Sequence, residues 1–462
     1  MTRLILIGVL LLALVVTSCG SGAVVPPLTV GQIVAVRGAG GEGVLWGPPG
    51  TADPATEVHI DGSSVAGTAL ADGSCRLRLD SLPGTMIVRY LRGGVQRQAA
   101  ITSTTLDARV APRLCSTGSG PNDMLYYGGW LFVANALDNA VTRYTLAGEG
   151  AGQFGLPQAA SPSYLGVGAD GFLAVVCNGS NTVVPLDASS LARVYLPDLD
   201  YTLSDPGIAF PGPSQPIVVG RDVFLPCSEI ATFAPTSYAP GKLRWLDYTP
   251  APGAPAEAHD FTTTGLNPQF TAYDAQSQRL FVVSSGDIQF DEDFVPHAES
   301  DSYLDVYSFA GEALVHEDAL NLGLIGAGRI TLSPDGHTAY IGNSLDGHLY
   351  KVDLQAMQVL RGAANPITLT ASFTFISDVA YTPDGSWVLA TSFNTDELYV
   401  VDPATDEVNP GPYPGPFSLS IDPHLLAGCA NVEVAPRAGS SGKCDVYVLL
   451  GVANAIARVE LF

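Results

Sequence analysis

The chain has 462 residues, enough for two or three domains of ordinary size. Hydrophobic residues make up 47%, so large cores can form and disorder is excluded. The 50 glycines and 34 prolines indicate many turns, and only 14% of the residues are charged. Lys and Arg number 21 against 45 Asp and Glu, for a net charge of −24. This excludes nucleic acid as a main partner, because phosphate binding needs clustered cations.

The N-terminus has the features of a bacterial export signal. Arg3 precedes an apolar run, residues 4–16, that is too short to span a membrane. The sequence from Val16 to Cys19 resembles the lipobox, whose cysteine is diacylated and becomes the new N-terminus. Residues 1–18 are therefore predicted to be a lipoprotein signal peptide and residues 19–28 a lipidated tether. An ordinary signal peptide with a chance cysteine is the alternative. We expect a membrane partner through this anchor, in the bacterial cell envelope, at the outer membrane or the cell surface.

Without Cys19 the chain has an even number of cysteines, which permits three disulfides in an exported protein. They are Cys75, Cys115, Cys177, Cys227, Cys429 and Cys444. The last two flank a Gly/Ser/Pro-containing insertion, and we expect them to be joined, because closing so short a loop would stabilise the fold by about 3 kcal/mol. Buried free thiols are the alternative, above all for Cys177 and Cys227.

Residues 29–106 predict a small β-sandwich. Four short strand-like runs, 33–36, 56–60, 75–79 and 86–90, are separated by Asp-Gly and Pro-Gly turns. The sequence from Ala71 through Gly84 resembles the core pattern of carboxypeptidase-regulatory-like and Ig-like spacer domains. The resemblance implies a spacer role for this domain.

From about residue 116 the chain repeats itself. Residues 132–144 and 340–353 align without a gap, each as a strand, a tight polar turn and a second strand. Similar units make about seven copies, spaced by roughly 40–60 residues, as the blades of a propeller require. The predicted fold class is therefore all-β, with residues 107–462 as a seven-bladed β-propeller after the β-sandwich.

Two repeats carry a family resemblance. The sequences SPDGHTAYIGNSLDGHLYKVD and TPDGSWVLATSFNTDELYVVD resemble the repeats of the YncE-like (YVTN-type) β-propellers. The copies at 222–247 and 276–307 depart from the pattern through long insertions. The resemblance implies an extracytoplasmic binding or scaffold protein, and related propellers include lactonases.

The ring needs a closing strand. The chain ends on the strand-like run 456–462, which leaves the last blade one strand short. Residues 107–114, directly before the first blade, are predicted to complete that blade, because a closed ring exposes no sheet edge.

The sequence offers no catalytic motif. It contains no HExxH, GxSxG or GxxxxGK[ST] pattern, and the seven histidines are scattered. No catalytic residue is assigned. An asparagine recurs after the second strand of several repeats, at Asn135, Asn178, Asn343 and Asn454, either as a turn residue or as part of an amide ring facing the central funnel.

Acidic residues crowd one insertion. Residues 280–328 contain ten acids and no Lys or Arg, and seven of the acids lie between Asp287 and Asp305. A solvated acidic loop is one interpretation; the other is a calcium site, since Ca²⁺ takes oxygen ligands from irregular loops. The candidate calcium ligands are Asp287, Asp291, Asp293 and Asp301.

Two insertions, 229–241 and 287–303, both follow the second strand of successive repeats. We expect them to stand side by side on one face of the disk, with Phe233, Tyr238 and Phe294 as contact anchors for an envelope or protein ligand. The predicted function is a binding or scaffold module of the cell envelope. The alternative is a propeller hydrolase of the lactonase type with a funnel metal.

Overall fold

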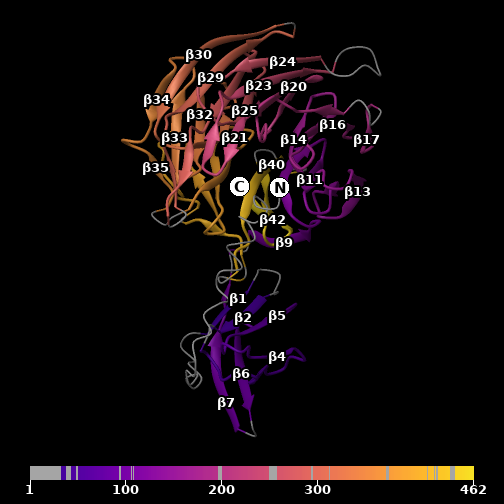
Figure 1. The fold of residues 1–462 in the computed structure, drawn as a ribbon. Helices are drawn as coiled ribbons and strands as arrows, with labels where there is room; N and C mark the ends of the chain where they lie inside the picture. The colour runs from indigo at the N-terminus through magenta and orange to yellow at the C-terminus, as the bar shows by residue number, and fades with distance from the viewer. Residues whose placement is uncertain are drawn as a thin grey trace. The chain divides into compact units, whose positions relative to one another are not determined.

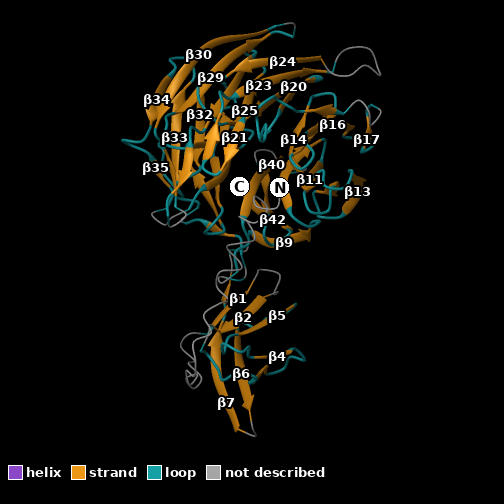
Figure 2. Ribbon diagram, in the orientation of Figure 1, coloured by secondary structure: helices purple, strands orange, loops and turns teal. Residues whose placement is uncertain are grey.

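The computed structural model describes residues 33–37, 43–47, 50–92, 95–105, 107, 109–195, 200–248, 257–292, 295–311, 313–370, 374–413, 415–420, 422, 425–437 and 443–461. All regular secondary structure in these ranges is β-strand, and they include no helix that could cross a membrane (Figure 2). The predicted signal peptide, Cys19 and the tether lie outside the described residues. The chain divides into two compact units, Met1–Thr105 and Leu106–Phe462.

The first unit is a β-sandwich of two four-stranded sheets, ordered β5-β2-β1-β8 and β4-β3-β6-β7 (Figure 1). Its strands are β1 (Val34–Arg37), β2 (Gly43–Gly47), β3 (Glu57–Ile60), β4 (Ala66–Thr68), β5 (Cys75–Leu79), β6 (Thr85–Arg92), β7 (Val95–Thr102) and β8 (Thr104–Thr105). In β5 buried and exposed residues alternate, so that one face of the strand enters the core. A single cluster that includes Leu45, Leu77 and Val88 is shared by the two sheets. The four predicted strands are confirmed.

The second unit is a β-propeller of seven antiparallel sheets, five of them four-stranded and two five-stranded, numbered here as blades 1 to 7 (Figure 1). Blade 1 has β10 (Pro121–Tyr127), β11 (Trp130–Asn135), β12 (Ala140–Thr145) and β13 (Gly150–Gly155). Blade 2 has β14 (Pro162–Val167), β15 (Phe172–Cys177), β16 (Thr182–Asp187) and, both against β16, β17 (Ala192–Arg193) and β18 (Tyr201–Thr202). Blade 3 has β19 (Ile217–Val219), β20 (Asp222–Cys227), β23 (Lys242–Asp247) and β24 (Glu257–Thr262). Blade 4 has β25 (Pro268–Asp274), β26 (Arg279–Ser284), β29 (Ser302–Phe309) and β30 (Leu314–Gly323).

Blades 5 to 7 complete the ring. Blade 5 has β31 (Ala327–Leu332), β32 (Thr338–Asn343), β33 (His348–Asp353) and, both against β33, β34 (Gln358–Arg361) and β35 (Ile367–Thr368). Blade 6 has β36 (Ile376–Tyr381), β37 (Val388–Ser392), β38 (Glu397–Val401) and β39 (Phe417–Ser418). Blade 7 has β40 (Cys429–Pro436), β41 (Cys444–Leu450), β42 (Ala455–Leu461) and β9 (Val110–Ser116).

Strand β9 closes the ring, as predicted. It pairs antiparallel with β42, with Val110 opposite Val459 and Ser116 opposite Ala455. The strand begins and ends slightly later than the predicted segment 107–114. The last blade is therefore built from both ends of the propeller's chain.

The second strand of each blade reads as an apolar run because neighbouring blades cover both of its faces. Every residue of β15 and of β20 is buried. Phe132 of blade 1 and Val175 of blade 2 belong to one cluster, and similar clusters fill the other blade boundaries. Stability therefore depends on contacts between blades, which no blade can supply alone.

The predicted disulfide between Cys429 and Cys444 is wrong. These residues lie at opposite ends of the β40–β41 ladder, where Cys429 is opposite Leu450 and Cys444 is opposite Pro436. At about 3.4 Å per residue the two ends of the ladder are roughly 20 Å apart, whereas a disulfide requires Cα atoms within about 7 Å. The other cysteines named above are also free thiols, in keeping with the alternative interpretation.

Candidate functional site

The strands of each blade alternate in direction, which sorts the loops onto two faces of the disk. Loops from the second to the third strand and the connections between blades emerge on one face, here called the insertion face. Turns from the first to the second and from the third to the fourth strand emerge on the other, here called the turn face. The two long insertions form hairpins on the insertion face, β21 (Ile230–Phe233) with β22 (Thr236–Tyr238) and β27 (Ile288–Phe290) with β28 (Pro296–Ala298).

The two hairpins lie side by side, as the alternating direction of the strands predicts. The Gln289 side-chain amide donates a hydrogen bond to the Thr236 carbonyl oxygen over 3.0 Å. Burial, together with the nearby Asp287 carboxylate, raises the pKa of Tyr238 to about 12. Tyr238 is half-buried at the end of β22, opposite Ile230 and away from the tip of the first hairpin.

Large apolar side chains are exposed at the hairpins. Phe233 is 46% exposed on the first hairpin, and Phe290 and Val295 are 54% and 44% exposed on the second. The predicted anchor Phe294 lies outside the described residues. Phe290 is therefore an exposed aromatic side chain that the list of predicted anchors left out.

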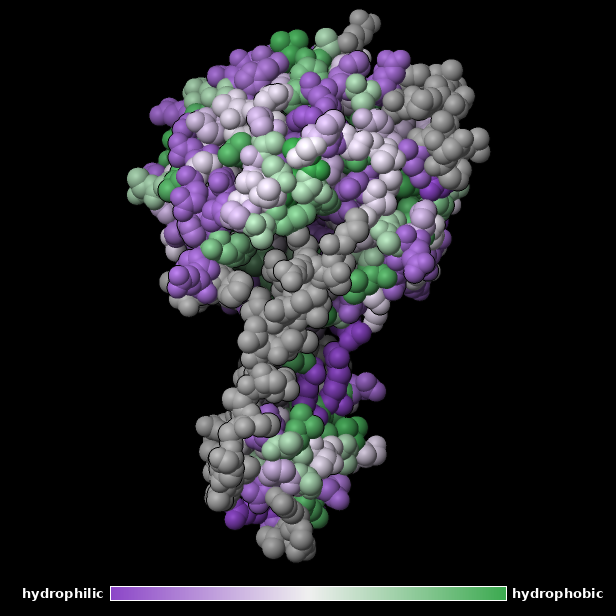
Figure 3. All heavy atoms as spheres, in the orientation of Figure 1, coloured by the Kyte–Doolittle hydropathy of each residue, from purple (hydrophilic) through white to green (hydrophobic). Residues whose placement is uncertain are grey.

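The exposed apolar residues of the propeller gather on the insertion face. Among the described residues of this unit, eight of the ten large apolar side chains that are exposed belong to its loops: Leu137, Phe233, Phe290, Val295, Leu324, Leu425, Leu426 and Val452. The other two, Val315 and Leu360, lie on outer strands, so the turn face has none in the described chain. Green patches interrupt the purple surface of the propeller on the side shown in Figure 3. Exposed apolar patches are typical of interaction sites, so this face is taken as the candidate site.

The described candidate calcium ligands accept hydrogen bonds from the hairpin itself or from the neighbouring strand β30. Asp287 accepts from Gln289, Asp291 from the Val295 amide, and Asp301 from the Asn321 side chain. Asp293 lies outside the described residues. No group of three or more His, Cys, Asp or Glu within the described ranges has the geometry to hold a metal ion. The hydrogen bonds of these three carboxylates agree with the interpretation as a solvated acidic loop.

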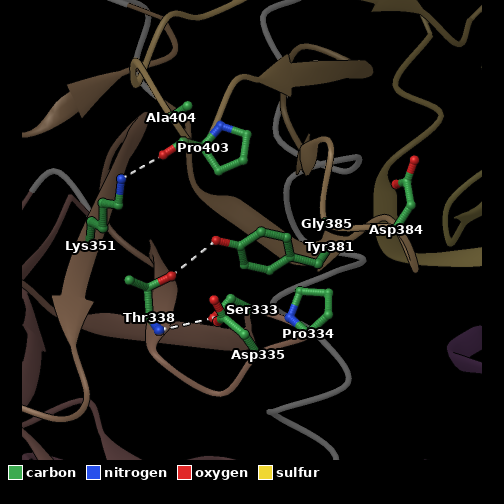
Figure 4. A pocket seen from close by; sticks show the side chains of 10 residues that line it. All are labelled: Ser333, Pro334, Asp335, Thr338, Lys351, Tyr381, Asp384, Gly385, Pro403 and Ala404. Carbon is green, nitrogen blue, oxygen red and sulfur yellow. Dashed lines mark hydrogen bonds between the residues drawn. The ribbon is translucent and has the colours of Figure 1, made fainter.

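The turn face carries a shallow depression of about 380 Å³ between blades 5 and 6 (Figure 4). The Asp-Gly turns of the two repeats, with Asp335 and Asp384, line it together with Tyr381 and Lys351. Lys351 donates to the Pro403 carbonyl oxygen over 2.7 Å and to the Asp406 carboxylate over 2.8 Å. Its ammonium group is therefore already held by the protein.

A polar cluster fills the axis of the propeller, where the sequence indicated none. Six of the seven innermost strands have a register shift near their first residues. A β-bulge re-aims the side chain beside it. The side chains at or directly after these shifts are Asp123, Tyr164, Phe270, Arg329, Asp378 and Asn431.

Contacts within this axial cluster join successive blades and also link blade 1 to blades 5 and 7, which are far from it in sequence. Arg329 of blade 5 donates to Asp123 of blade 1 over 3.0 Å and lies 3.8 Å from Asp378 of blade 6. Asn431 of blade 7 donates to both carboxylates, over 3.2 and 2.9 Å. The cluster therefore ties four blades together across the axis.

The two aspartates also accept hydrogen bonds from backbone amides of neighbouring inner strands. Asp123 accepts the Leu165 amide of the next blade over 2.8 Å, and Asp378 accepts the Val432 amide over 2.9 Å. Burial raises the pKa of both carboxyl groups, to about 6 for Asp378, although Arg329 opposes the shift. Burial also raises the pKa of Glu433 on the same inner strand as Asn431, and the two aspartates add to the effect.

The sequence analysis did not predict this cluster because it aligned the repeats on their second and third strands and did not compare the innermost strands. The available signal was a charged residue in an otherwise apolar inner strand, as in Asp123, Arg329 and Asp378. These three residues are at most 5% exposed. Which of them would meet depended on the closure of the ring, because the bonded pairs are up to 308 residues apart.

The recurring asparagines act within turns and strand ends. Asn454 has a positive φ of 50° and accepts the Gly120 amide, while Asn343 accepts the Leu345 amide and donates to Tyr350. Asn135 donates to Thr142 across its own hairpin. These contacts support the turn interpretation over a ring of amides facing the funnel.

No protein-family model and no curated protein matches the sequence. The fold is that of known β-propellers. Hydrazine synthase of Kuenenia stuttgartiensis is 14% identical, with a TM-score of 0.53 over 74% of this chain and 96% of that chain. Virginiamycin B lyase of Staphylococcus aureus is 10% identical, with a TM-score of 0.52 over 74% and 96%. The Cps50 (Swd1) propeller of Myceliophteria thermophila is 10% identical, with a TM-score of 0.50 over 75% and 98%.

These structural similarities place the protein in the class of β-propeller proteins. They show its fold and say nothing about its function. The finer resemblances, to YncE-like propellers and to carboxypeptidase-regulatory-like domains, stay predictions.

Proposed function

We propose that this protein is a lipid-anchored binding module of the bacterial cell envelope, and that the insertion face of its propeller docks a macromolecular partner. The observation that carries the proposal is the gathering of exposed apolar side chains on that face. Leaving such side chains in water is unfavourable by about 25 cal/mol per Å², so a partner that covers them gains free energy.

The two hairpins support the proposal as the centre of the docking surface. The hydrogen bond between Gln289 and Thr236 joins the two hairpins, and each hairpin carries one exposed phenylalanine, Phe233 or Phe290. Aromatic anchors surrounded by polar residues are typical of protein interfaces. The predicted lipidation of Cys19 supports the location, because it would hold the propeller at a membrane where envelope proteins are within reach.

Site-specific photo-crosslinking in intact cells tests the proposal. A benzophenone amino acid replaces Phe233 or Phe290, and the matched control replaces Leu360, which is 41% exposed on outer strand β34. We expect a shared adduct from positions 233 and 290 and none from position 360. We also expect Phe233→Ser to reduce the adduct at position 290, because both side chains would touch one partner. Equal adducts from all three positions, or none from the hairpins, would contradict the proposal.

A further inference from the structure

The charge of the insertion face identifies the chemistry of its partner, an inference that rests on the proposed function. The loops and connections of this face comprise fourteen segments between consecutive strands of the propeller. Their sequences contain twelve Asp and Glu but no Lys or Arg. The acids are Asp138, Asp205, Glu229, Asp287, Asp291, Glu292, Asp293, Glu299, Asp301, Asp346, Asp396 and Asp422. The turns of the other face contain eight acids but also Arg221, Arg437 and Lys443, so the insertion face differs in having no Lys or Arg.

Some of these acidic side chains are buried within the fold, and others are exposed to solvent. Glu229, Asp396 and Asp422 are buried, whereas Asp138, Asp291, Glu292 and Glu299 are exposed. The exposed acids border the apolar side chains in sequence, since Asp138 follows Leu137 and Asp291 follows Phe290. In the second hairpin the exposed acids Asp291, Glu292 and Glu299 lie close to the exposed Phe290 and Val295 in sequence, and we call these acids the anionic rim.

Two cations on the strand that follows the first hairpin are paired with other acids. Lys242 begins the strand after the first hairpin, and its ammonium group is paired with Asp205 at 2.9 Å and with Asp260 at 3.2 Å. Arg244 is 3% exposed and paired with Glu229 at 2.9 Å. Both cations are therefore committed to acids of blade 3 and its connections.

We propose that the partner is a protein with a basic surface, which places Lys or Arg side chains around an apolar centre that covers Phe233 and Phe290. Complementary potentials steer such a partner toward this face, and like charges exclude acidic partners. A membrane surface does not fit, because bacterial lipid headgroups that carry net charge are anionic and the rim repels them. The partner thus differs in charge from this protein, whose own net charge is −24.

Charge reversal of the rim tests the inference with the crosslinking residue held at position 290. The variant Glu292→Lys/Glu299→Lys changes two exposed acids of the second hairpin. The control Glu149→Lys/Glu407→Lys makes the same change of net charge at two exposed acids of the turn face. We expect the rim variant to reduce the adduct about tenfold or more, and the control to leave it within about twofold. Melting temperatures of the purified variants verify that both still fold.

The outcomes separate this inference from the proposed function. An adduct that survives rim reversal, or that falls equally in both variants, overturns the basic partner while docking on the insertion face stands. Failure to form any adduct from positions 233 and 290 overturns the proposed function and this inference together. Mass spectrometry of the adduct provides a second measurement, since the crosslinked segment of the partner is expected to contain Lys or Arg; an acidic segment contradicts the inference.

Discussion

Arg329 shows how one residue can hold a ring of blades together. Its guanidinium group lies at the axis between the carboxylates of Asp123 and Asp378, and its side chain is 6% exposed. The aromatic rings of Tyr164 and Phe270 lie 6.0 and 5.2 Å from it. The carboxylates, the hydrogen bonds and the aromatic rings together compensate the desolvation cost of burying this cation. Its removal leaves two buried carboxylates without their cation.

Replacing Arg329 therefore has a large predicted cost. We expect Arg329→Met to lower the free energy of unfolding by about 3–5 kcal/mol, because breaking a buried ion pair leaves uncompensated charge. The control Arg221→Met removes an arginine whose side chain is 44% exposed and 3.5 Å from Asp170, and its effect is expected to stay below about 1 kcal/mol. Urea unfolding of both variants measures the difference. Equal midpoints would show that the axial cluster does not stabilise the ring.

Buried carboxyl groups make the stability depend on pH. Burial raises the pKa of Asp222 and Asp378 to about 6 and that of Glu229 to about 7. Between about pH 4.5 and 7 the folded state thus holds protons that the unfolded chain has released, so the free energy of unfolding decreases as the pH rises. Acids with lowered pKa values, such as Asp187, act only below this window.

We accordingly expect the melting temperature to fall from pH 5 to pH 7. The variant Glu229→Gln keeps a side chain that can accept from Arg244 but cannot release a proton, so its melting temperature should change less over the same range. Scanning calorimetry at half-unit steps of pH tests this. A melting temperature that rises from pH 5 to pH 7, or an unchanged slope in the variant, would refute the assignment.

At the scale of elements, the ring is closed by pairing its two ends. Strand β9 contributes Val110, which is 2% exposed, to the cluster that also contains Val459 and Leu461 of β42. Arg109, next to this strand, lies 4.7 Å from the Phe417 ring of blade 6. The strand thus covers an open edge and also packs against its neighbours. A closed ring is expected to unfold as a unit, because each blade relies on the next for its core.

Deletion of residues 107–116 should open blade 7. We expect the propeller to lose cooperative melting, or its melting temperature to fall by about 10 °C or more, because an edge strand and one side of a cluster become exposed. The control deletes residues 33–104, which removes the β-sandwich and leaves β9 in place. Circular dichroism melting compares the two. If both deletions shift the propeller's transition alike, β9 is not the element that closes the ring.

At the scale of the whole molecule, the chain joins two units with separate cores. Among the residues that the structure describes, the cluster of the β-sandwich contains no residue of the propeller, and the propeller's clusters contain none of the β-sandwich. Each unit thus has the hydrophobic core that a separate domain needs. This arrangement suits a tethered protein, since a spacer can carry a binding domain without contributing to its core.

The anchor itself is tested by Cys19→Ala. Loss of the cysteine removes the predicted acylation site, and with it the only membrane attachment that we propose, so the variant should move from the detergent phase to the aqueous phase. The control Cys177→Ala removes a buried thiol of blade 2 and should leave the partition unchanged. Phase separation in Triton X-114 measures both. Unchanged partition of Cys19→Ala would exclude the lipid anchor.

The repeat, the closing strand and the adjacent insertions could all be predicted from the sequence. These follow from local patterns: apolar second strands, polar turns such as the one at Asp335-Gly336, and the alternation of strand direction. Each is encoded within one repeat or between successive repeats. The exposed Phe233 was found in the same way, because it stands in an insertion where no core position required it.

The contacts between residues far apart in the chain could not be predicted from the sequence and became visible in the folded structure. The register of β40 and β41 separated Cys429 from Cys444, although their spacing along the chain suggested a bridge. Closure of the ring brought Asp123 to Asn431 across 308 residues, and it gathered Leu137 and Val452 on the same face as the hairpins. The physical reason is that register and ring closure depend on the packing of all blades together, which no single segment encodes.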